Sequence, residues 1–285
     1  MPMFEILDKK ELAPHIKWLR VNAPLVARAA KAGQFIILRL HEKGERIPLT
    51  LFKWSKEEGY IEIVFQEVGK TTYELGTYEI GDKIMDIVGP LGRPTEIENF
   101  GNVVVVSGGV GAPIGYAVAR GLKEAGNHLT VIAGFRSKDF VILEDEFSEI
   151  ADELLITTDD GSYMRKGFTT DVLKEYIEEG NKVDFVFTVG PVIMMKLIAE
   201  ITKKYGIKTV ASLNPIMIDG TGMCGACRVK VGGEIKFACV DGPDFDAHQV
   251  DFDELIMRLK QYQNEEEIAM KRYLKKGGCS NGKKD

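Results

Sequence analysis

The alternation of apolar strands with amphipathic helices after residue 100 constrains the fold of this chain most. Residues 102–126, NVVVVSGGVGAPIGYAVARGLKEAG, combine a continuous apolar run, a glycine turn and an amphipathic helix. Further strand-like runs and helical segments follow at 128–135, 153–161, 169–180, 183–191 and 192–206. Strands that are apolar along their whole length and are separated by helices predict a parallel sheet covered on both faces.

The residues before this alternation predict a different architecture. Short strand-like runs alternate with glycine-containing turns at 15–21, 33–40, 60–68 and 83–92. Many short strands at this spacing favour a small antiparallel β barrel. After residue 212, glycines and cysteines concentrate in a loop-rich stretch. We therefore expect four segments: a barrel at 1–99, a parallel-sheet α/β domain at 100–212, a small module at 213–263, and a C-terminal helix with a flexible tail at 264–285.

Composition excludes several classes of function. The 285 residues are 45% hydrophobic and carry a formal net charge of -6, and no basic stripe with interleaved aromatic residues predicts binding to nucleic acid. The N-terminal MPMFEILDKKEL lacks the apolar core of a signal peptide, and no apolar run reaches the roughly 18 residues of a membrane span. We expect a cytoplasmic protein. Three of the four cysteines lie within sixteen residues, which favours metal ligation in a reducing compartment over disulfides.

The cysteine-rich loop carries the most specific motif. Its potential ligands follow the pattern D-x4-C-x2-C-x11-C, formed by Asp219, Cys224, Cys227 and Cys239. This is the plant-type ferredoxin spacing with aspartate in the first position, and it predicts an iron-sulfur cluster. The alternative is zinc held by the three cysteines and His248.

The glycine turn after the first apolar strand is a weaker signal. Gly108, Gly109 and Gly111 stand where backbone N–H groups at a helix N-terminus can approach a pyrophosphate, and Pro113 begins the helix. The third glycine position of the dinucleotide fingerprint holds Ile114, however, and no acidic residue follows about 20 residues later. A tight structural turn therefore remains an alternative to a nucleotide site.

Two segments of the barrel are candidates for phosphate contacts. Gly69, Lys70 and Thr71 do not form a P-loop, because that motif requires glycine where Val64 stands. They could still meet another phosphate, and the alternative is an ordinary solvated turn. Arg46, in ERIPLTLF, is a candidate buried cation for a diphosphate, and the alternative is a surface arginine at a strand edge.

Taken together, the motifs resemble those of the ferredoxin reductase superfamily. The likeness rests on AGQF at 32–35, RIPLT at 46–50, VGKTT at 68–72 with GPLGRP at 89–94, SGGVGAPIG at 107–115 and TVGP at 188–191. With the cysteine module, it covers nearly the whole chain. Within the superfamily, the sequence resembles the branch of the dihydroorotate dehydrogenase electron-transfer subunit. It is most similar to the small subunits of NADH-dependent reduced ferredoxin:NADP oxidoreductases, because Asp219 stands where the dihydroorotate branch has cysteine.

The resemblance implies three cofactors and assigns residues to each. FAD would lie in the barrel, along Arg46, Pro48, Leu49 and Thr50, with further phosphate contacts from Gly69, Lys70, Thr71 and Thr72. NAD(H) would lie over Gly108, Gly109, Val110, Gly111 and Pro113, with the nicotinamide near Gly190 and Pro191. A [2Fe-2S] cluster would be bound by Asp219, Cys224, Cys227 and Cys239.

Three charged residues bear on the choice between NAD and NADP. Asp159 and Asp160, after the third sheet strand, would repel a 2′-phosphate and could accept hydrogen bonds from a free ribose diol. Arg136, at the end of the second strand, argues in the opposite direction. We expect NAD, because two carboxylates outweigh one arginine and the resembling subunits use it.

The implied function is that of the NAD(H)-linked subunit of a flavin-based electron-bifurcating oxidoreductase. Its partner would be a larger subunit with a second FAD, [4Fe-4S] clusters and an NADP(H) site, and ferredoxin would react through that complex. One alternative is an electron-transfer subunit of dihydroorotate dehydrogenase. Another, from a different class, is a zinc-stapled nucleotide-binding regulator without turnover.

Overall fold

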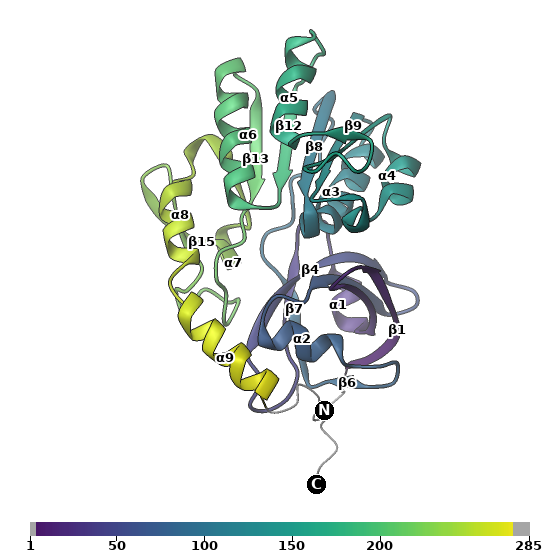
Figure 1. The fold of residues 1–285 in the computed structure, drawn as a ribbon, viewed down its shortest axis with the longest axis vertical. Helices are drawn as coiled ribbons and strands as arrows, with labels where there is room; N and C mark the ends of the chain where they lie inside the picture. The colour runs from purple at the N-terminus through teal and green to yellow at the C-terminus, as the bar shows by residue number, and fades with distance from the viewer. Residues whose placement is uncertain (1–3, 276–285) are drawn as a thin grey trace.

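The N-terminal part of the chain forms a nearly closed antiparallel barrel in the computed structural model, which describes residues 4–275 (Figure 1). Its elements are β1 (Phe4–Ala13), β2 (Ile16–Asn22), α1 (Pro24–Ala29), β3 (Phe35–Arg39), β4 (Arg46–Ser55), β5 (Tyr60–Gln66), α2 (Lys70–Gly76), β6 (Lys83–Ile84) and β7 (Asp86–Leu91). The strand order is β6-β1-β2-β5-β4-β3-β7. Because Met85 alone separates β6 from β7, the two ends of the sheet come together. The expected barrel is confirmed.

Strand β3 shows how the barrel strands divide their side chains between two cores. Successive side chains of a strand point to opposite faces of the sheet. Ile36 and Leu38 are fully buried in the barrel interior, whereas Phe35 and Ile37 belong to a separate core outside it. This strand therefore connects the barrel to the rest of the molecule.

The middle of the chain forms the expected parallel sheet. Its elements are β8 (Asn102–Gly108), η1 (Gly109–Gly111), α3 (Ala112–Glu124), β9 (His128–Phe135), η2 (Lys138–Phe140), α4 (Glu144–Ile150), β10 (Glu153–Thr158), β11 (Arg165–Lys166), α5 (Thr169–Glu178), β12 (Phe185–Val189), α6 (Val192–Tyr205) and β13 (Lys208–Ser212). The strand order is β11-β10-β9-β8-β12-β13-β16. Val103 and Val105 of β8 pack on the α3 side, and Val104 and Val106 pack with α5 and α6. Burial of both faces explains why these strands are apolar along their whole length.

The C-terminal elements pack against both larger units. They are β14 (Arg228–Val231), β15 (Glu234–Phe237), α7 (Ala238–Asp241), β16 (Asp244–Asp246), η3 (Ala247–Gln249), α8 (Phe252–Leu259) and α9 (Gln263–Lys275). Strand β16 pairs antiparallel with β13, so this part of the chain extends the parallel sheet. Helix α9 runs back toward the barrel and contacts α2 (Figure 1). The predicted flexible tail and Cys279 lie outside the described residues.

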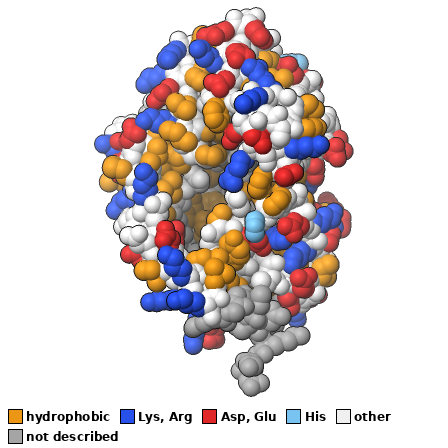
Figure 2. Space-filling model, in the orientation of Figure 1, with side chains coloured by type: hydrophobic (Ala, Val, Ile, Leu, Met, Phe, Trp, Pro, Cys, Tyr) orange, Lys and Arg blue, Asp and Glu red, His pale blue; other side chains and the backbone are white. Residues whose placement is uncertain are grey.

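Two shared cores hold these units together. The outer face of the barrel packs on α3, where the rings of Phe52 and Tyr116 lie 5.3 Å apart between centroids. Phe35 and Ile37 pack in a second core that also contains Cys227 and Cys239. Between these contacts the surface is hollowed, with hydrophobic side chains around the hollow (Figure 2). Among residues 4–275, no helix is long and apolar enough to cross a membrane.

Candidate functional site

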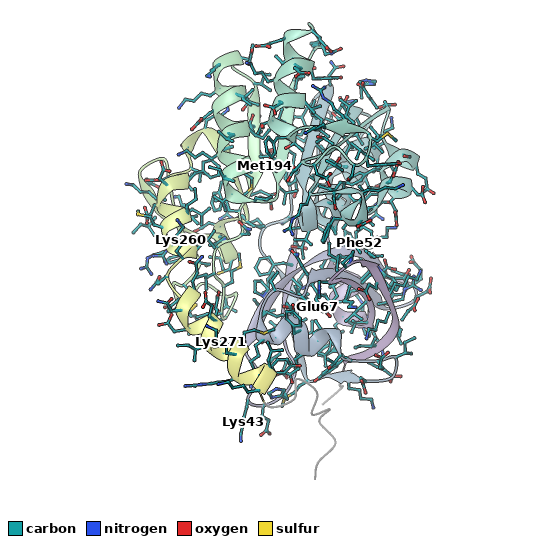
Figure 3. All side chains as sticks on the ribbon, in the orientation of Figure 1. Lys43, Phe52, Glu67, Met194, Lys260 and Lys271 are labelled. Carbon is teal, nitrogen blue, oxygen red and sulfur yellow. The ribbon has the colours of Figure 1, made fainter. Side chains whose placement is uncertain are left out.

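The glycine turn after β8 packs tightly against the turn after β12. A Cβ atom at Gly108 would lie 2.8 Å from the Met194 sulfur, and one at Gly190 would lie 3.0 Å from the backbone N and O of Gly108. A Cβ atom at Gly111 would lie 2.7 Å from the Val189 carbonyl oxygen. Figure 3 labels Met194 on α6 above the hollow. Close backbone packing therefore accounts for glycine at these three positions.

Gly109 differs from its neighbours in the same turn. It has a φ of +53°, and a Cβ atom there would meet nothing within 4 Å. The predicted residues Val110, Pro113 and Pro191 follow the two turns: Val110 is half-buried, Pro113 is buried, and Pro191 is exposed before α6. The backbone at Gly109 thus faces open space at the carboxyl edge of the sheet, where ligands of such sheets bind.

Two buried hydroxyl groups flank this turn without a hydrogen-bond partner. Ser107 Oγ lies at the end of β8 and Thr188 Oγ1 at the end of β12, and neither has a partner among the described residues. Thr188 pairs with Val106 and Val189 with Ser107, so the two side chains stand on adjacent strands. Buried polar atoms normally have partners, so these two mark the edge of the sheet as a place suited to a polar ligand.

The three charged residues predicted to select the dinucleotide lie close together. Asp159 N donates to the Phe135 carbonyl, and Asp160 N donates to the Arg136 carbonyl at 3.4 Å. Burial raises the pKa of the Asp159 carboxyl, and attraction by Arg136 opposes this shift. Hydrogen bonds from Ser162 lower the pKa of Asp160. Arg136 is exposed, with its guanidinium 5.2 Å from the centroid of the Phe140 ring.

The structure corrects the prediction of a buried Arg46. This residue is exposed as the first residue of β4, and its side chain has no hydrogen bond or ion pair among residues 4–275. Pro48, Leu49 and Thr50 follow it on the same strand and are half-buried. Its place at the start of the strand leaves the guanidinium in solvent, where it can reach an anionic ligand.

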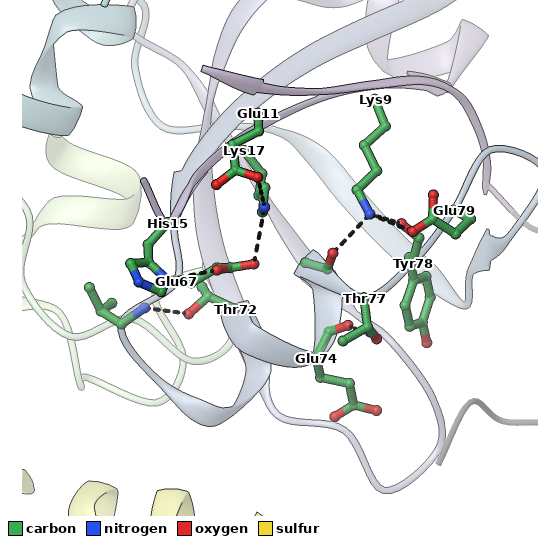
Figure 4. Close-up of polar contacts among 12 residues, drawn as sticks. Lys9, Glu11, His15, Lys17, Glu67, Thr72, Glu74, Thr77, Tyr78 and Glu79 are labelled. Atoms are coloured by element: carbon green, nitrogen blue, oxygen red, sulfur yellow. Dashed lines mark hydrogen bonds and ion pairs between the residues drawn. The ribbon is translucent and has the colours of Figure 1, made fainter. Parts of the chain in front are cut away.

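The segment around Gly69 is the start of helix α2 and not a turn between strands. Thr72 Oγ1 accepts hydrogen bonds from the N–H groups of Val68 and Gly69, each at 3.0 Å. Figure 4 labels Thr72 at this helix start. This hydroxyl satisfies donors that a helix start leaves free. A Cβ atom at Gly69 would meet nothing within 4 Å.

A carboxylate already contacts the two side chains that follow Gly69. Thr71 Oγ1 donates to Glu45 Oε2 at 2.5 Å, and Lys70 Nζ lies 3.8 Å from Glu45 Oε1. The pair of side chains therefore binds an anionic oxygen group in this structure. This supports the fit of a phosphate at the same place, because carboxylate and phosphate oxygens accept the same hydrogen bonds.

Two of the potential cluster ligands, Cys227 and Cys239, lie together, and Asp219 contacts the backbone of Cys224. Cys227 and Cys239 are buried, and their sulfur atoms lie 3.1 Å apart. Asp219 Oδ2 accepts a hydrogen bond from Cys224 N at 2.8 Å, on a more exposed part of the loop. Backbone N–H groups are directed at two sulfurs, from Ala226 to Cys224 and from Cys239 to Cys227, each at 3.5 Å. Burial raises the pKa of Cys239 to about 12, assisted by its contact with Cys227.

This arrangement distinguishes the two metal hypotheses. Within residues 4–275, no three His, Cys, Asp or Glu side chains converge as ligands of a single ion. His248 does not join the cysteines, because its Nε2 lies 2.9 Å from Thr202 Oγ1 on α6. Without His248 the zinc hypothesis lacks its fourth ligand, whereas Asp219 lies on the same loop as the cysteines, as a dinuclear cluster requires.

Glycines seat the ligand loop against the barrel. Gly220, Gly222 and Gly225 all have positive φ values, between 67° and 83°. A Cβ atom at Gly220 would lie 2.6 Å from Leu91 Cδ1 and 2.7 Å from Ile37 Cγ1. The loop therefore contacts β3 and β7 directly.

Sequence reasoning missed Glu45, Ser107 and Thr188 as site residues. Ser107 and Thr188 interrupt otherwise apolar strands next to glycine turns, and this was the available signal. Nothing local distinguishes Glu45 from its charged neighbours, because its role depends on contact with a helix 26 residues away.

Comparison with known proteins identifies relatives along nearly the full length. Residues 214–251 match a family model described as the iron-sulfur cluster binding domain of dihydroorotate dehydrogenase B. A Thermotoga maritima protein, named as a homolog of the dihydroorotate dehydrogenase B (NAD(+)) electron transfer subunit, is 52% identical over 97% of each chain. The electron transfer subunit of that enzyme from Desulforamulus reducens is 32% identical, over 87% of this chain and 99% of its own.

Solved structures agree with this assignment. A structure of NADH-dependent reduced ferredoxin-NADP oxidoreductase, described in work on flavin-based electron bifurcation, is 50% identical with a TM-score of 0.91, covering 96% of this chain and 99% of its own. Phthalate dioxygenase reductase is 15% identical with a TM-score of 0.59, covering 81% and 86%, and shows the shared fold alone. The chain belongs to the family of dihydroorotate dehydrogenase B electron transfer subunits, within the ferredoxin reductase fold.

Proposed function

We propose that this chain is the NAD(H)-linked subunit of a flavin-based electron-bifurcating NADH-dependent ferredoxin:NADP oxidoreductase. The observation that carries the proposal is the placement of the ligand loop, with Cys227 and Cys239 in a core shared with barrel strand β3 and helix α6. A cluster held there would lie next to both the barrel and the parallel sheet. The 50% identical solved structure of such an oxidoreductase supports the same function.

The residues that would hold FAD lie on β4 and at the start of α2. Arg46 offers a guanidinium without a partner among residues 4–275, and Lys70 and Thr71 already contact a carboxylate. Pro48, Leu49 and Thr50 would line the flavin, and Gly69 and Thr72 would complete the phosphate contacts. The cation, the hydroxyls and the open backbone at Gly69 fit a diphosphate.

NAD(H) would lie across the carboxyl edge of the parallel sheet. Gly109 would present its backbone N–H there, while the packed glycines Gly108, Gly111 and Gly190 hold the two turns together. Val110, Pro113 and Pro191 would shape the surface beside them. The proximity of Asp159 and Asp160 to the end of β9 supports NAD over NADP, because carboxylates repel a 2′-phosphate.

The cluster ligands would be Asp219, Cys224, Cys227 and Cys239. When bound, nicotinamide supplies a hydride, FAD accepts an electron pair and releases single electrons, and a [2Fe-2S] cluster carries one electron at a time. The chain itself fixes the distances between the three sites and directs backbone N–H groups at the sulfurs. Such hydrogen bonds tune the potential of a cluster.

The partner in this proposal is a larger subunit with a second FAD, [4Fe-4S] clusters and an NADP(H) site, through which ferredoxin would react. The described residues form one parallel sheet, with one carboxyl edge for a nicotinamide dinucleotide, and this supports the need for a partner because exchange between NAD and NADP requires a second site. Co-purification with that subunit, and NADP(H) binding by the complex, tests this part.

A second candidate function is electron transfer to dihydroorotate dehydrogenase. The names of relatives at 52% and 32% identity favour it. Binding of orotate by the purified partner would support this candidate, whereas binding of NADP would support the first.

An ultraviolet-visible spectrum of the anaerobically purified full chain, before and after NADH, tests the redox proposal. We expect flavin bands overlaid on broad iron-sulfur absorption, bleached by NADH, with iron and not zinc in the sample. A colourless protein that contains zinc would contradict the proposal and support the nucleotide-binding regulator.

A further inference from the structure

We propose that Glu45 is an affinity-determining residue of the flavin site, because its carboxylate competes with the FAD diphosphate for Lys70 and Thr71. This inference rests on the proposed function, since it takes these two residues as part of the diphosphate site. Glu45 lies in the loop of residues 40–45 between β3 and β4, immediately before Arg46.

The competition follows from the hydrogen-bonding capacity of Thr71. A threonine hydroxyl has one proton to donate. That proton goes to Glu45 Oε2, at an oxygen-to-oxygen distance of 2.5 Å. Because Thr71 is buried with 4% of its surface exposed, the hydroxyl cannot turn to a new partner in solvent. A phosphate oxygen can therefore accept from Thr71 only if the carboxylate of Glu45 withdraws.

The negative charge of Glu45 also opposes binding of the diphosphate. Glu45 Oε1 lies 3.8 Å from Lys70 Nζ, so the carboxylate also neutralises part of the positive charge near Gly69. A diphosphate brought to the same cation meets a like charge, and like charges at close range repel. The Glu45 side chain is 53% exposed, so it can regain its hydration when it leaves.

Helix α2 does not depend on Glu45 for its position. Thr72 binds the N–H groups of Val68 and Gly69 at its start. At its end, Lys9 Nζ donates to the carbonyls of Gly76 and Tyr78 at 2.9 and 2.7 Å (Figure 4). Loss of the Glu45 carboxylate should therefore leave Lys70 and Thr71 in place for a ligand.

The test is FAD binding by the flavin-stripped full chain, followed through quenching of flavin fluorescence. The variants are Glu45→Gln, Thr71→Val and the double variant. Glu42→Gln is the matched control, because Glu42 is an exposed residue of the same loop. We expect Glu45→Gln to lower the Kd for FAD about threefold or more, because the charge that competes with the diphosphate is gone. A change of this size is typical of one exposed charge contact. Thr71→Val should raise the Kd, and Glu42→Gln should leave it unchanged.

Two further readouts separate competition from other effects. The gain from Glu45→Gln should shrink in the Thr71→Val background, because part of that gain comes from replacing the charged acceptor of Thr71 with a neutral, weaker one. It should also shrink at high salt, because salt screens exposed charges. An unchanged or higher Kd in Glu45→Gln, in a wild-type chain that binds FAD, would overturn this inference alone. A wild-type chain that does not bind FAD would overturn the proposed function as well.

Discussion

At the scale of single residues, Asp219 is the proposed cluster ligand whose replacement is most informative. Its carboxylate accepts hydrogen bonds from the N–H groups of Thr221 and Cys224 at 2.9 and 2.8 Å. The bond from Thr221 contributes most to lowering the pKa of Asp219. The group is therefore anionic at neutral pH and suited to bind iron.

Replacing Asp219 with cysteine should change the cluster without removing it. A thiolate donates more electron density to iron than a carboxylate does, so Asp219→Cys should lower the reduction potential, on the order of tens of mV. A redox titration followed by electron paramagnetic resonance measures this. Asp253→Cys, at an exposed position of α8, is the control. An unchanged potential and spectrum would show that Asp219 is not a ligand.

At the scale of elements, Asp184 connects β12 to β8. Its Oδ2 accepts from the backbone N–H and the side-chain amide of Asn102, at 2.9 and 2.8 Å, and its Oδ1 lies 3.1 Å from Lys182 Nζ. The pKa of Asp184 is lowered to about 2, chiefly by the hydrogen bond that it accepts from the backbone N–H of Asn102. This pKa lies below the pKa of an aspartate in the unfolded chain, which is about 3.9. The ionised carboxylate therefore stabilises the fold at pH values above about 3.9. The contribution disappears as the pH falls toward 2.

The Asp184→Ala variant should therefore melt at a lower temperature at pH 7, by about 2 to 4 °C. Its difference from the wild type should shrink as the pH falls from about 4 to about 2, because the unfolded chain binds the proton there before the folded chain does. Thermal melts followed by circular dichroism at several pH values check this. Glu149→Ala, on the exposed side of α4, should show no such convergence. A constant Asp184→Ala difference across this range would contradict the assignment.

The glycine that seats the ligand loop offers a second test at this scale. Gly220 has a φ of +73°, and its added Cβ would clash with Leu91 and Ile37. Gly233, in the β14–β15 turn, has a φ of +83° but open space around it. Both alanine variants carry backbone strain of about 1 kcal/mol. The free energy of unfolding should fall by about 1 to 3 kcal/mol more in Gly220→Ala than in Gly233→Ala, because the added Cβ overpacks the contact with Leu91 and Ile37.

Urea unfolding and iron content of the two variants distinguish clash from strain. Gly220→Ala should also lose bound iron, because the loop can no longer reach β3 and β7. Equal losses in Gly220→Ala and Gly233→Ala would show that contact with the barrel is unimportant.

At the scale of the whole molecule, strand β3 joins the barrel to the cysteine-rich loop. Ile36 points into the barrel core, while the adjacent Ile37 points into the core that contains Cys227 and Cys239. Both are buried, so each change to alanine should cost about 2 to 5 kcal/mol. Iron release to a chelator should accelerate in Ile37→Ala and not in Ile36→Ala. Equal rates in the two variants would argue that the loop is held independently of the barrel.

Local pattern determined the architecture of this chain. Continuous apolar runs separated by amphipathic helices predicted the parallel sheet, because strands buried on both faces must be apolar at every position. Short strands between glycine turns predicted the barrel. Strand β1 was not anticipated, because its sequence FEILDKKELA has charged residues at alternate and adjacent positions. Helix α2 was expected as a turn, since seven residues give too little periodicity to recognise.

The tertiary structure decided which of these surfaces meet. Sequence spacing identified four potential ligands, but not that the sulfurs of Cys227 and Cys239 lie together or that His248 contacts Thr202. The contact of Gly108 with Gly190, the pairing of β16 with β13 and the bond from Thr71 to Glu45 all join distant segments. Periodicity records which face of an element is buried, because burial acts on each residue locally. Which other element covers that face depends on packing between distant segments, and a local sequence pattern does not record this.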